Sequence, residues 1–375
     1  MRWQVIYAIT ATLLSNTATS SYVHEQGLPV EKTVTLPGGQ IIDWIKREIQ
    51  GEIAHPPPSI GGGDSFGKIN LSPFDEVSRG PEGTVPIPRS DGKLPQTKAS
   101  PPHGNGNRHN ARQYATKHWY VSSSQSLNSH GSTGTISLFK AFVANEDDFS
   151  LLQTAVAYEN VPRIGIQTVE AGWINFPSQV AQPHLFTFFN TNNYGGFGDY
   201  ISGWNTDYRG WVQYDNTYYP GMPLSPLSVV DGTQQNLQIQ YKLFSGNWWL
   251  GVNGKWIGYY PASMFVTSGN NAAVTLCDHA TTIDWYGEVY QSENQLTTTD
   301  MGSGHWANER LGKAAYIRNM RITSTNDSES DYDGSRGVTV SDPNRYTIET
   351  HFNSGTDFGS YFFLGGPGAG GVIDG

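Results

Sequence analysis

Alternating apolar and polar positions run from about residue 118 to the C-terminus, and this period of two is typical of β-strands. Gly, Asn and Asp interrupt the alternation at short intervals, as turns between strands require. The clearest strands are expected at residues 164–170, 236–244, 248–252, 255–260 and 282–290. Asn253-Gly254, between two of them, predicts a type I′ hairpin turn.

The phase of two of these strands places a glutamate on a defined face. In residues 164–170, Glu170 shares a face with Ile166 and Thr168 and ends the predicted strand. In residues 282–290, Glu288 lies mid-strand on a polar and aromatic face. The other members of that face are Asp284, Tyr286 and Tyr290, and the opposite face carries Ile283, Trp285 and Val289.

The N-terminal third has a different texture. Arg2, an apolar run to Leu14 and small polar residues near Ala18 predict a signal peptide at residues 1–20. A pro-segment is expected at 21–112. Within it, the helical spacing of apolar residues in 41–53 predicts a short helix. Residues 55–112 are rich in Pro, Gly, Ser and Asn, which predicts a linker without a core of its own.

Composition supports an all-β protein. The chain has 43 Gly, 21 Pro and 13% aromatic residues in 375, which favours short strands and tight turns over long helices. We therefore predict a single antiparallel β-sandwich domain over residues 113–375. Cys277 is the only cysteine, so no intrachain disulfide can form and the fold must rest on packing.

Charge and targeting signals narrow the class of partner. A net charge of -10 argues against a nucleic-acid partner, which would need a clustered basic surface. The signal peptide predicts a secreted, extracellular protein with no membrane attachment after its removal, and we expect a monomer. In that compartment the triplets beginning at Asn70 and Asn326 would be glycosylation sites.

Several common catalytic motifs are missing or fail on inspection. Residues 62–68 copy most of a phosphate-binding loop, but Ile69 supplies no hydroxyl for Mg²⁺. The sequence contains neither H-E-x-x-H nor G-x-S-x-G. Cys277-Asp278-His279 could not all face one metal from a strand, because alternate residues point in opposite directions. We therefore predict no metal site and no cofactor.

Carboxylates remain as candidate catalytic groups. Two Glu on one concave sheet face can hydrolyse a bond without a metal, since one ionised carboxylate activates water while a protonated one polarises the carbonyl and protonates the leaving group. Spacing alone does not single out any particular Glu.

Five longer words in the sequence are more specific, and in this order they resemble the neprosin family of secreted glutamic peptidases. They are QTVEAGW from Gln167, WWLGVNGKWIGYYP from Trp248, WYGEV from Trp285, MGSGH from Met301 and FFLGGPG from Phe362. The resemblance covers about residues 118–375. It implies a β-sandwich behind an N-terminal pro-segment, cleavage of protein or peptide substrates after proline, and a catalytic pair formed by Glu170 and Glu288.

Trp173, Tyr286 and Tyr290 are candidate walls of a substrate cleft, and Asp284 is a reserve carboxylate on the face of Glu288. Two alternatives share the same composition and fold class. Two Glu among aromatic residues also build the cleft of a glycoside hydrolase, and an aromatic sheet face suits a non-catalytic carbohydrate-binding module. Only the ordered family words separate these readings from an endopeptidase.

Overall fold

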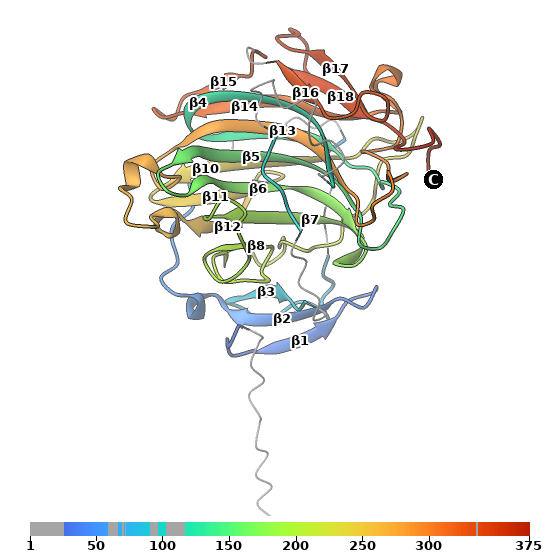
Figure 1. Cartoon of the computed structure of the whole chain (residues 1–375). Coiled ribbons are helices and arrows are strands. Elements are labelled where there is room, and N and C mark those ends of the chain that lie inside the picture. Colours follow the sequence, from blue (N-terminus) through green and yellow to red (C-terminus); the bar gives the residue numbers. More distant parts are fainter. Residues whose placement is uncertain are drawn as a thin grey trace, which may run out of the picture.

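The computed structural model describes residues 26–58, 67–69, 71, 73–90, 97–102, 117–334 and 337–375. The helices of this part are single-turn 3₁₀ helices at Arg47–Gln50, Ala262–Phe265, Ala272–Val274 and Ala307–Glu309. The remaining regular structure is antiparallel β-sheet, which confirms the predicted fold class (Figure 1). Among these residues no helix is long and apolar enough to cross a membrane. The predicted signal peptide lies outside the described residues.

One strand, β4 (His118–Ser137), belongs to both layers of the sandwich. Its first half pairs with β13 (Ala280–Tyr290) and its second half with β10 (Asn236–Phe244) and β14 (Ala315–Ser324). The first layer continues from β13 through β5 (Phe149–Val161), β6 (Gly165–Phe176), β7 (Val180–Asn190) and β8 (Ser202–Trp204), with β16 (Val338–Val340) on the other side of β4. The second layer adds β11 (Asn247–Val252), β12 (Lys255–Pro261), β9 (Val212–Gln213), β15 (Glu329–Asp331), β17 (Thr347–His351) and β18 (Tyr361–Gly365).

The main hydrophobic core lies between these two layers. Trp173 from β6, Trp285 from β13 and Trp248 from β11 are all fully buried in it. Burial of large aromatic side chains from both layers supplies most of the packing energy of such a sandwich, about 25 cal/mol for each Å² of apolar surface removed from water. A second cluster covers the opposite, outer face of the first layer.

The strands expected from alternation are found close to their predicted bounds. β10 spans the predicted residues 236–244, and β11 and β12 begin within a residue of prediction. Asn253 and Gly254 both have positive φ, 50° and 82°, as a type I′ turn requires. The strand predicted to end at Glu170 instead continues to Phe176, so Glu170 lies mid-strand.

The N-terminal segment differs most from prediction. The helix expected at residues 41–53 is wrong, because Ile41–Lys46 forms strand β2, followed by one 3₁₀ turn. Pairing with β1 (Lys32–Thr35) and β3 (Thr84–Pro88) overrides the helical spacing. β3 lies inside the stretch predicted to be an unstructured linker, so that prediction is wrong there. This small sheet packs on the sandwich through Trp44, which contacts Phe74, whose ring in turn stacks on Tyr219. Gln40 also donates to the carbonyl of Gly221.

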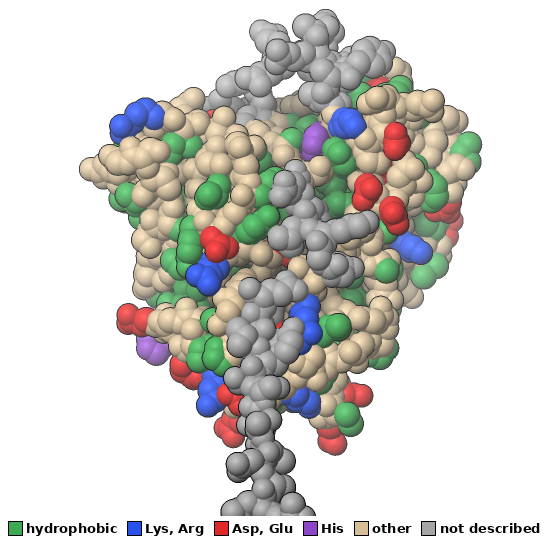
Figure 2. Space-filling view, turned by 60° about the horizontal axis from the view of Figure 1, so that its bottom comes forward, with side chains coloured by type: hydrophobic (Ala, Val, Ile, Leu, Met, Phe, Trp, Pro, Cys, Tyr) green, Lys and Arg blue, Asp and Glu red, His purple; other side chains and the backbone are tan. Residues whose placement is uncertain are grey.

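Charged side chains are scattered over the face seen in Figure 2, where Lys and Arg alternate with Asp and Glu without gathering into a basic patch. This distribution agrees with the net charge of -10.

Candidate active site

Glu170 and Glu288 lie on neighbouring parts of one sheet face. Glu170 is on β6 and Glu288 on β13, and β5 runs between them, with Ala155 opposite Glu170 and Leu151 opposite Glu288. Their face is the outer face of the first layer, pointing away from the core between the layers. Both side chains are nevertheless fully buried. The predicted pair is therefore brought together in a covered cleft.

Lys98 explains how two carboxylates can be buried side by side. Its Nζ lies 2.6 Å from Glu288 Oε2 and 3.1 Å from Glu170 Oε2, and its side chain has no exposed surface. The same nitrogen donates to the Tyr286 hydroxyl at 3.3 Å. The short segment of residues 97–102 that carries Lys98 crosses the front of the first layer (Figure 1). Because one ammonium contacts both glutamates, the two oxygens are as close as a single bridging water would require.

Neutral donors surround Glu170. Its Oε2 accepts from Gln153 Nε2 at 2.7 Å and from the Tyr286 hydroxyl at 2.9 Å. Its Oε1 accepts from Thr168 Oγ1 at 3.0 Å and from the hydroxyl of Tyr194. The carbonyl oxygen of Gln153 is buried and has no partner among the described residues. Rotation of that amide would let its oxygen accept a hydrogen bond from a protonated Glu170, so this environment can accommodate either form of the carboxyl.

Glu288 has a basic partner instead. The Nδ1 atom of His118 lies 2.6 Å from Glu288 Oε1. His118 begins β4, and its ring packs on Tyr290 with centroids 4.8 Å apart. Tyr120, two residues later, is the cross-strand neighbour of Glu288. Its ring lies edge-on to Tyr286 at 6.0 Å.

These contacts set the ionisation of the cleft. Burial acts to raise the pKa of Glu288, but Lys98 and then His118 outweigh it and hold that pKa below its ordinary value of 4.5. Burial acts to lower the pKa of Lys98, but Glu170 and Glu288 together raise it, so the ammonium stays charged. Burial, and then the nearby carboxylates, raise the pKa of Tyr120, Tyr194 and Tyr286 well above 10. All three tyrosine hydroxyls are therefore neutral, and those of Tyr194 and Tyr286 donate to Glu170.

Glycines behind the pair explain two of the sequence words. A Cβ at Gly172 would lie 1.9 Å from the backbone oxygen of Leu152, so only glycine lets β6 approach β5 beside Glu170. A Cβ at Gly287 would lie 2.7 Å from Leu364 and 2.9 Å from the sulfur of Met301. Leu364 and Met301 come from the FFLGGPG and MGSGH words. Those words therefore pack directly behind the strand that carries Glu288.

The other predicted site residues lie on both faces of the sheet. Tyr286 and Tyr290 lie on the face of the pair, as predicted. Trp173 does not: it is on the opposite face of β6, fully buried in the core between the layers, where its indole nitrogen donates to the carbonyl of Ser137. It therefore cannot be a wall of the cleft. Asp284 is on the same strand face as Glu288 and is fully buried.

The predicted glycosylation sites lie apart from the cleft or outside the described residues. Asn326 lies in the exposed turn between β14 and β15, with Ser324 and Ser328 bonded to its side chain. Asn70 lies outside the described residues.

Sequence reasoning missed Lys98, His118, Tyr120, Gln153 and Tyr194. It also missed the aromatic wall beside Glu170, which continues along β7 and β8 and consists of Phe186, Phe188, Trp204 and Tyr194, with Phe197 next to it. Phe188 and Tyr194 stack with centroids 5.9 Å apart. The alternation from His118 to Tyr120 was the one available signal, because it places both on one face.

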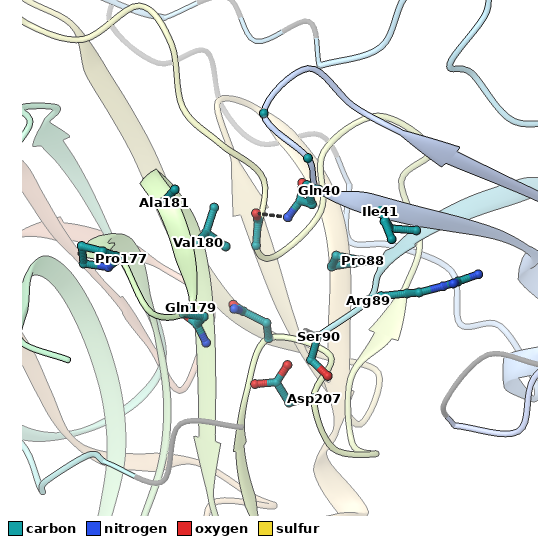
Figure 3. Close-up of a pocket in the computed structure, with 14 residues that line it drawn as sticks. Gln40, Ile41, Pro88, Arg89, Ser90, Pro177, Gln179, Val180, Ala181 and Asp207 are labelled. Carbon is teal, nitrogen blue, oxygen red and sulfur yellow. Dashed lines mark hydrogen bonds between the residues drawn. The ribbon is translucent and has the colours of Figure 1, made fainter. Parts of the chain in front are cut away.

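A separate hollow lies between the small N-terminal sheet and the sandwich. Its lining includes Gln40, Arg89, Gln179 and Asp207, and none of the candidate catalytic residues belongs to it (Figure 3). Within the described ranges, no group of three or more His, Cys, Asp and Glu side chains is arranged to hold a metal ion.

Solved structures of two peptidases are similar to this chain. Among solved structures, scytalido-glutamic peptidase with a peptide-based transition-state analogue shares 7% identity at a TM-score of 0.36, covering 66% of this chain and 98% of that one. SCP-B, a member of the eqolisin family of peptidases in complex with the tripeptide Ala-Ile-His, gives 7% identity and a TM-score of 0.35, covering 66% and 96%. At these TM-scores the likeness carries no weight for function.

The family comparison is decisive. The model of the Neprosin family matches residues 146–367, which is more than half of the chain and includes both glutamates. The chain therefore belongs to the neprosin family, whose members are peptidases of the glutamic type.

Proposed function

We propose that this chain is the precursor of a secreted endopeptidase in which Glu170 and Glu288 hydrolyse peptide bonds. The observation that carries the proposal is the pair of fully buried carboxylates contacted by one ammonium nitrogen. A surface glutamate has no such neighbours, and buried carboxylates brought this close are typical of acid–base dyads.

The two glutamates take different roles in this proposal. Glu288 is the general base, because His118 contacts it and favours its ionised form. Glu170 carries the proton, and the unpartnered side-chain oxygen of Gln153 can accept a hydrogen bond from that carboxyl group. Glu288 removes a proton from water as its oxygen attacks the carbonyl carbon. Glu170 then protonates the leaving nitrogen, so one water is consumed and one peptide bond is cleaved.

The described arrangement supports a latent precursor. Lys98 fills the position between the carboxylates that water must occupy, and it belongs to the predicted pro-segment of residues 21–112. We propose that acid removes this segment by protonating Glu288, after which the enzyme cuts its own linker. Pro101 and Pro102, which follow Lys98 closely, are candidate cleavage positions, and Pro95 lies outside the described residues.

A preference for proline is the finer part of the proposal. Membership of the neprosin family supports it. The aromatic wall next to Glu170 offers flat rings such as Phe188 and Tyr194, against which a proline ring can pack. The same wall would suit a sugar ring, so substrate class must be tested directly.

The test begins with the purified precursor, which is acidified and then incubated with unfolded casein and, separately, with xylan and β-glucan. We expect casein to be digested, and peptide mapping to find the new C-termini at proline. Glu288→Gln should lower the rate by at least about 100-fold, within the range of acid–base catalysis. Glu293→Gln, an exposed glutamate just beyond β13, is the matched control and should retain the wild-type rate.

Release of reducing sugar with casein left intact would replace the endopeptidase by the glycoside hydrolase. Casein digestion by Glu288→Gln at the wild-type rate would remove the proposed dyad. Casein digestion without enrichment of proline at the cut sites would remove only the specificity.

A further inference from the structure

The hydroxyl of Tyr120 is the unexplained polar group of the cleft. Its oxygen is buried and makes no hydrogen bond of ordinary geometry within the described part of the chain, although it faces the carboxylate of Glu288, which helps to raise its pKa. A buried hydroxyl without a partner is unfavourable, and native proteins retain few of them. Tyr286 and Tyr194 differ in this respect, because both hydroxyls donate to Glu170.

The position of Tyr120 is tightly fixed. Its residue pairs directly with Glu288 across β4 and β13, which places both side chains on the cleft face. Its backbone nitrogen donates to Ser341 Oγ at 2.6 Å, and its carbonyl accepts from the Ser341 amide at 2.9 Å. The ring rests against Tyr286 on one side and His118 on the other. The hydroxyl is therefore held beside the dyad.

We propose that Tyr120 is a catalytic residue whose hydroxyl stabilises the oxyanion that forms at the scissile carbonyl. The proposal rests on the endopeptidase function above. In the described state Lys98 contacts both carboxylates. A preformed donor beside the dyad that makes no ordinary hydrogen bond in the free enzyme can bind the transition state more strongly than the ground state.

The step conserves atoms and charge. When water attacks, the carbonyl π electrons move to oxygen, the water proton goes to Glu288, and the new oxyanion accepts a hydrogen bond from Tyr120. The tyrosine proton is not transferred. When the C–N bond breaks, Glu170 gives its proton to the nitrogen, the C=O bond re-forms, and the hydrogen bond to Tyr120 weakens.

The test compares Tyr120→Phe with Tyr332→Phe in the acid-processed full-length chain, using a quenched-fluorescence peptide that the wild type cleaves. Tyr120→Phe should lower kcat about 10²–10³-fold, the usual effect of losing an oxyanion donor, with KM changed by less than about threefold. The thermal unfolding midpoint of its precursor should change little, because the hydroxyl makes no hydrogen bond of ordinary geometry.

Tyr332→Phe should show the opposite pattern. Its hydroxyl bonds Ser123 Oγ at 2.7 Å and the Ser124 carbonyl at 3.1 Å, on the core side of β4. This variant should lower the unfolding midpoint and leave kcat near the wild-type value.

A peptide aldehyde adds a measurement independent of turnover, because its hydrate resembles the tetrahedral intermediate. Tyr120→Phe should weaken its inhibition by the same factor as kcat, while binding of the cleaved product peptide stays unchanged. A Tyr120→Phe enzyme with wild-type kcat, or with an unchanged aldehyde affinity, overturns the oxyanion role. Glu288→Gln distinguishes failure of the Tyr120 proposal from failure of the endopeptidase proposal. If Glu288→Gln is inactive while Tyr120→Phe is fully active, the dyad stands and only Tyr120 loses its role.

Discussion

The two halves of the cleft hold the same side chain by different means. Both carboxylates contact Lys98, but Glu288 also lies beside a histidine, whereas the other groups that contact the Glu170 carboxylate are neutral hydroxyl and amide donors. A cation stabilises only the ionised form of a carboxylate, while a set of neutral donors that includes a rotatable amide tolerates a proton. The difference suggests how a pair of identical residues can divide the work of base and acid.

The largest expected effect separates the two glutamates. Glu288→Gln should lose nearly all activity, because an amide cannot remove a proton from water. Glu170→Gln keeps a polar group of the same size that can still donate to the substrate carbonyl, so it should retain more. We expect losses of about 10⁴-fold and 10²-fold respectively, the two ends of the range for acid–base catalysis. Single-turnover rates of the processed variants measure both, and equal losses would contradict the assignment of roles.

Removing the lysine tests the latency of the precursor. Lys98→Met removes the ammonium that the two buried carboxylates share, at a cost of about 3–5 kcal/mol for breaking a buried pair. The variant precursor should cleave peptide at pH 6 about 100-fold faster than the wild-type precursor, measured before any processing is visible on a gel. Lys32→Met, which changes a lysine bonded only to backbone carbonyls in the small sheet, is the control and should stay silent. A silent Lys98→Met precursor would show that other contacts close the cleft.

The pH at which the wild-type precursor opens follows from the direction of two pKa shifts. The lowered pKa of Glu288 stabilises the closed form above its ordinary value of 4.5, and this contribution is lost as the pH falls through the lower folded value. The raised pKa of Lys98 contributes at every pH below 10.5 and is lost only in alkali, so it does not change in acid. Processing, measured by mass spectrometry after stepwise acidification, should therefore begin below pH 4.5. Full processing at pH 6 would contradict this.

A smaller effect should come from the histidine. His118→Gln keeps a donor to Glu288 but removes the charge, so the acid limb of the kcat/KM profile should move up by about one pH unit. His118→Lys restores a cation and should move the limb back. If both variants give the wild-type profile, His118 is a packing residue for Tyr290 and not a partner of the base.

The smallest effects belong to the neutral donors around Glu170. Tyr194→Phe and Thr168→Val each remove one donor to Glu170 Oε1 and leave those to Oε2 in place. One net hydrogen bond is worth about 0.5–1.5 kcal/mol, so each variant should lose about two- to tenfold in kcat. A loss as large as that of Glu170→Gln from either variant would show that one donor controls the carboxyl by itself.

Local alternation was enough to find the two strands that carry Glu170 and Glu288, because apolar and polar side chains alternate along both. The same rule, continued past Glu170, would have placed Trp173 on the opposite side from the glutamate. The error came from ending the strand at Glu170, whereas β6 runs on to Phe176. Gly172 and Gly287 belong to two of the sequence words that indicated the family. The structure gives the physical reason for glycine at both positions, because a Cβ there would collide with neighbouring atoms.

Lys98 could not be found in this way. It lies in a Pro-, Gly- and Ser-rich stretch without periodicity, and its partner Glu288 is 190 residues away along the chain. Gln153 was equally hidden, because a glutamine on a strand carries no mark of what it faces. Family words predicted the pair itself, but the groups that surround it depend on contacts between distant strands, which only the fold supplies.

The strand shared by both layers also bears on the order of folding. His118 begins β4, and its partner Glu288 lies 170 residues further along the chain. The two hairpins formed by β10, β11 and β12 instead join residues only a few positions apart. Contacts of long sequence separation form slowly, because a large loop must close first. A nascent chain can therefore assemble its local hairpins long before both glutamates have their partners. Hydrolytic competence becomes a late event in the life of the polypeptide, arising only when the whole sandwich has closed around β4.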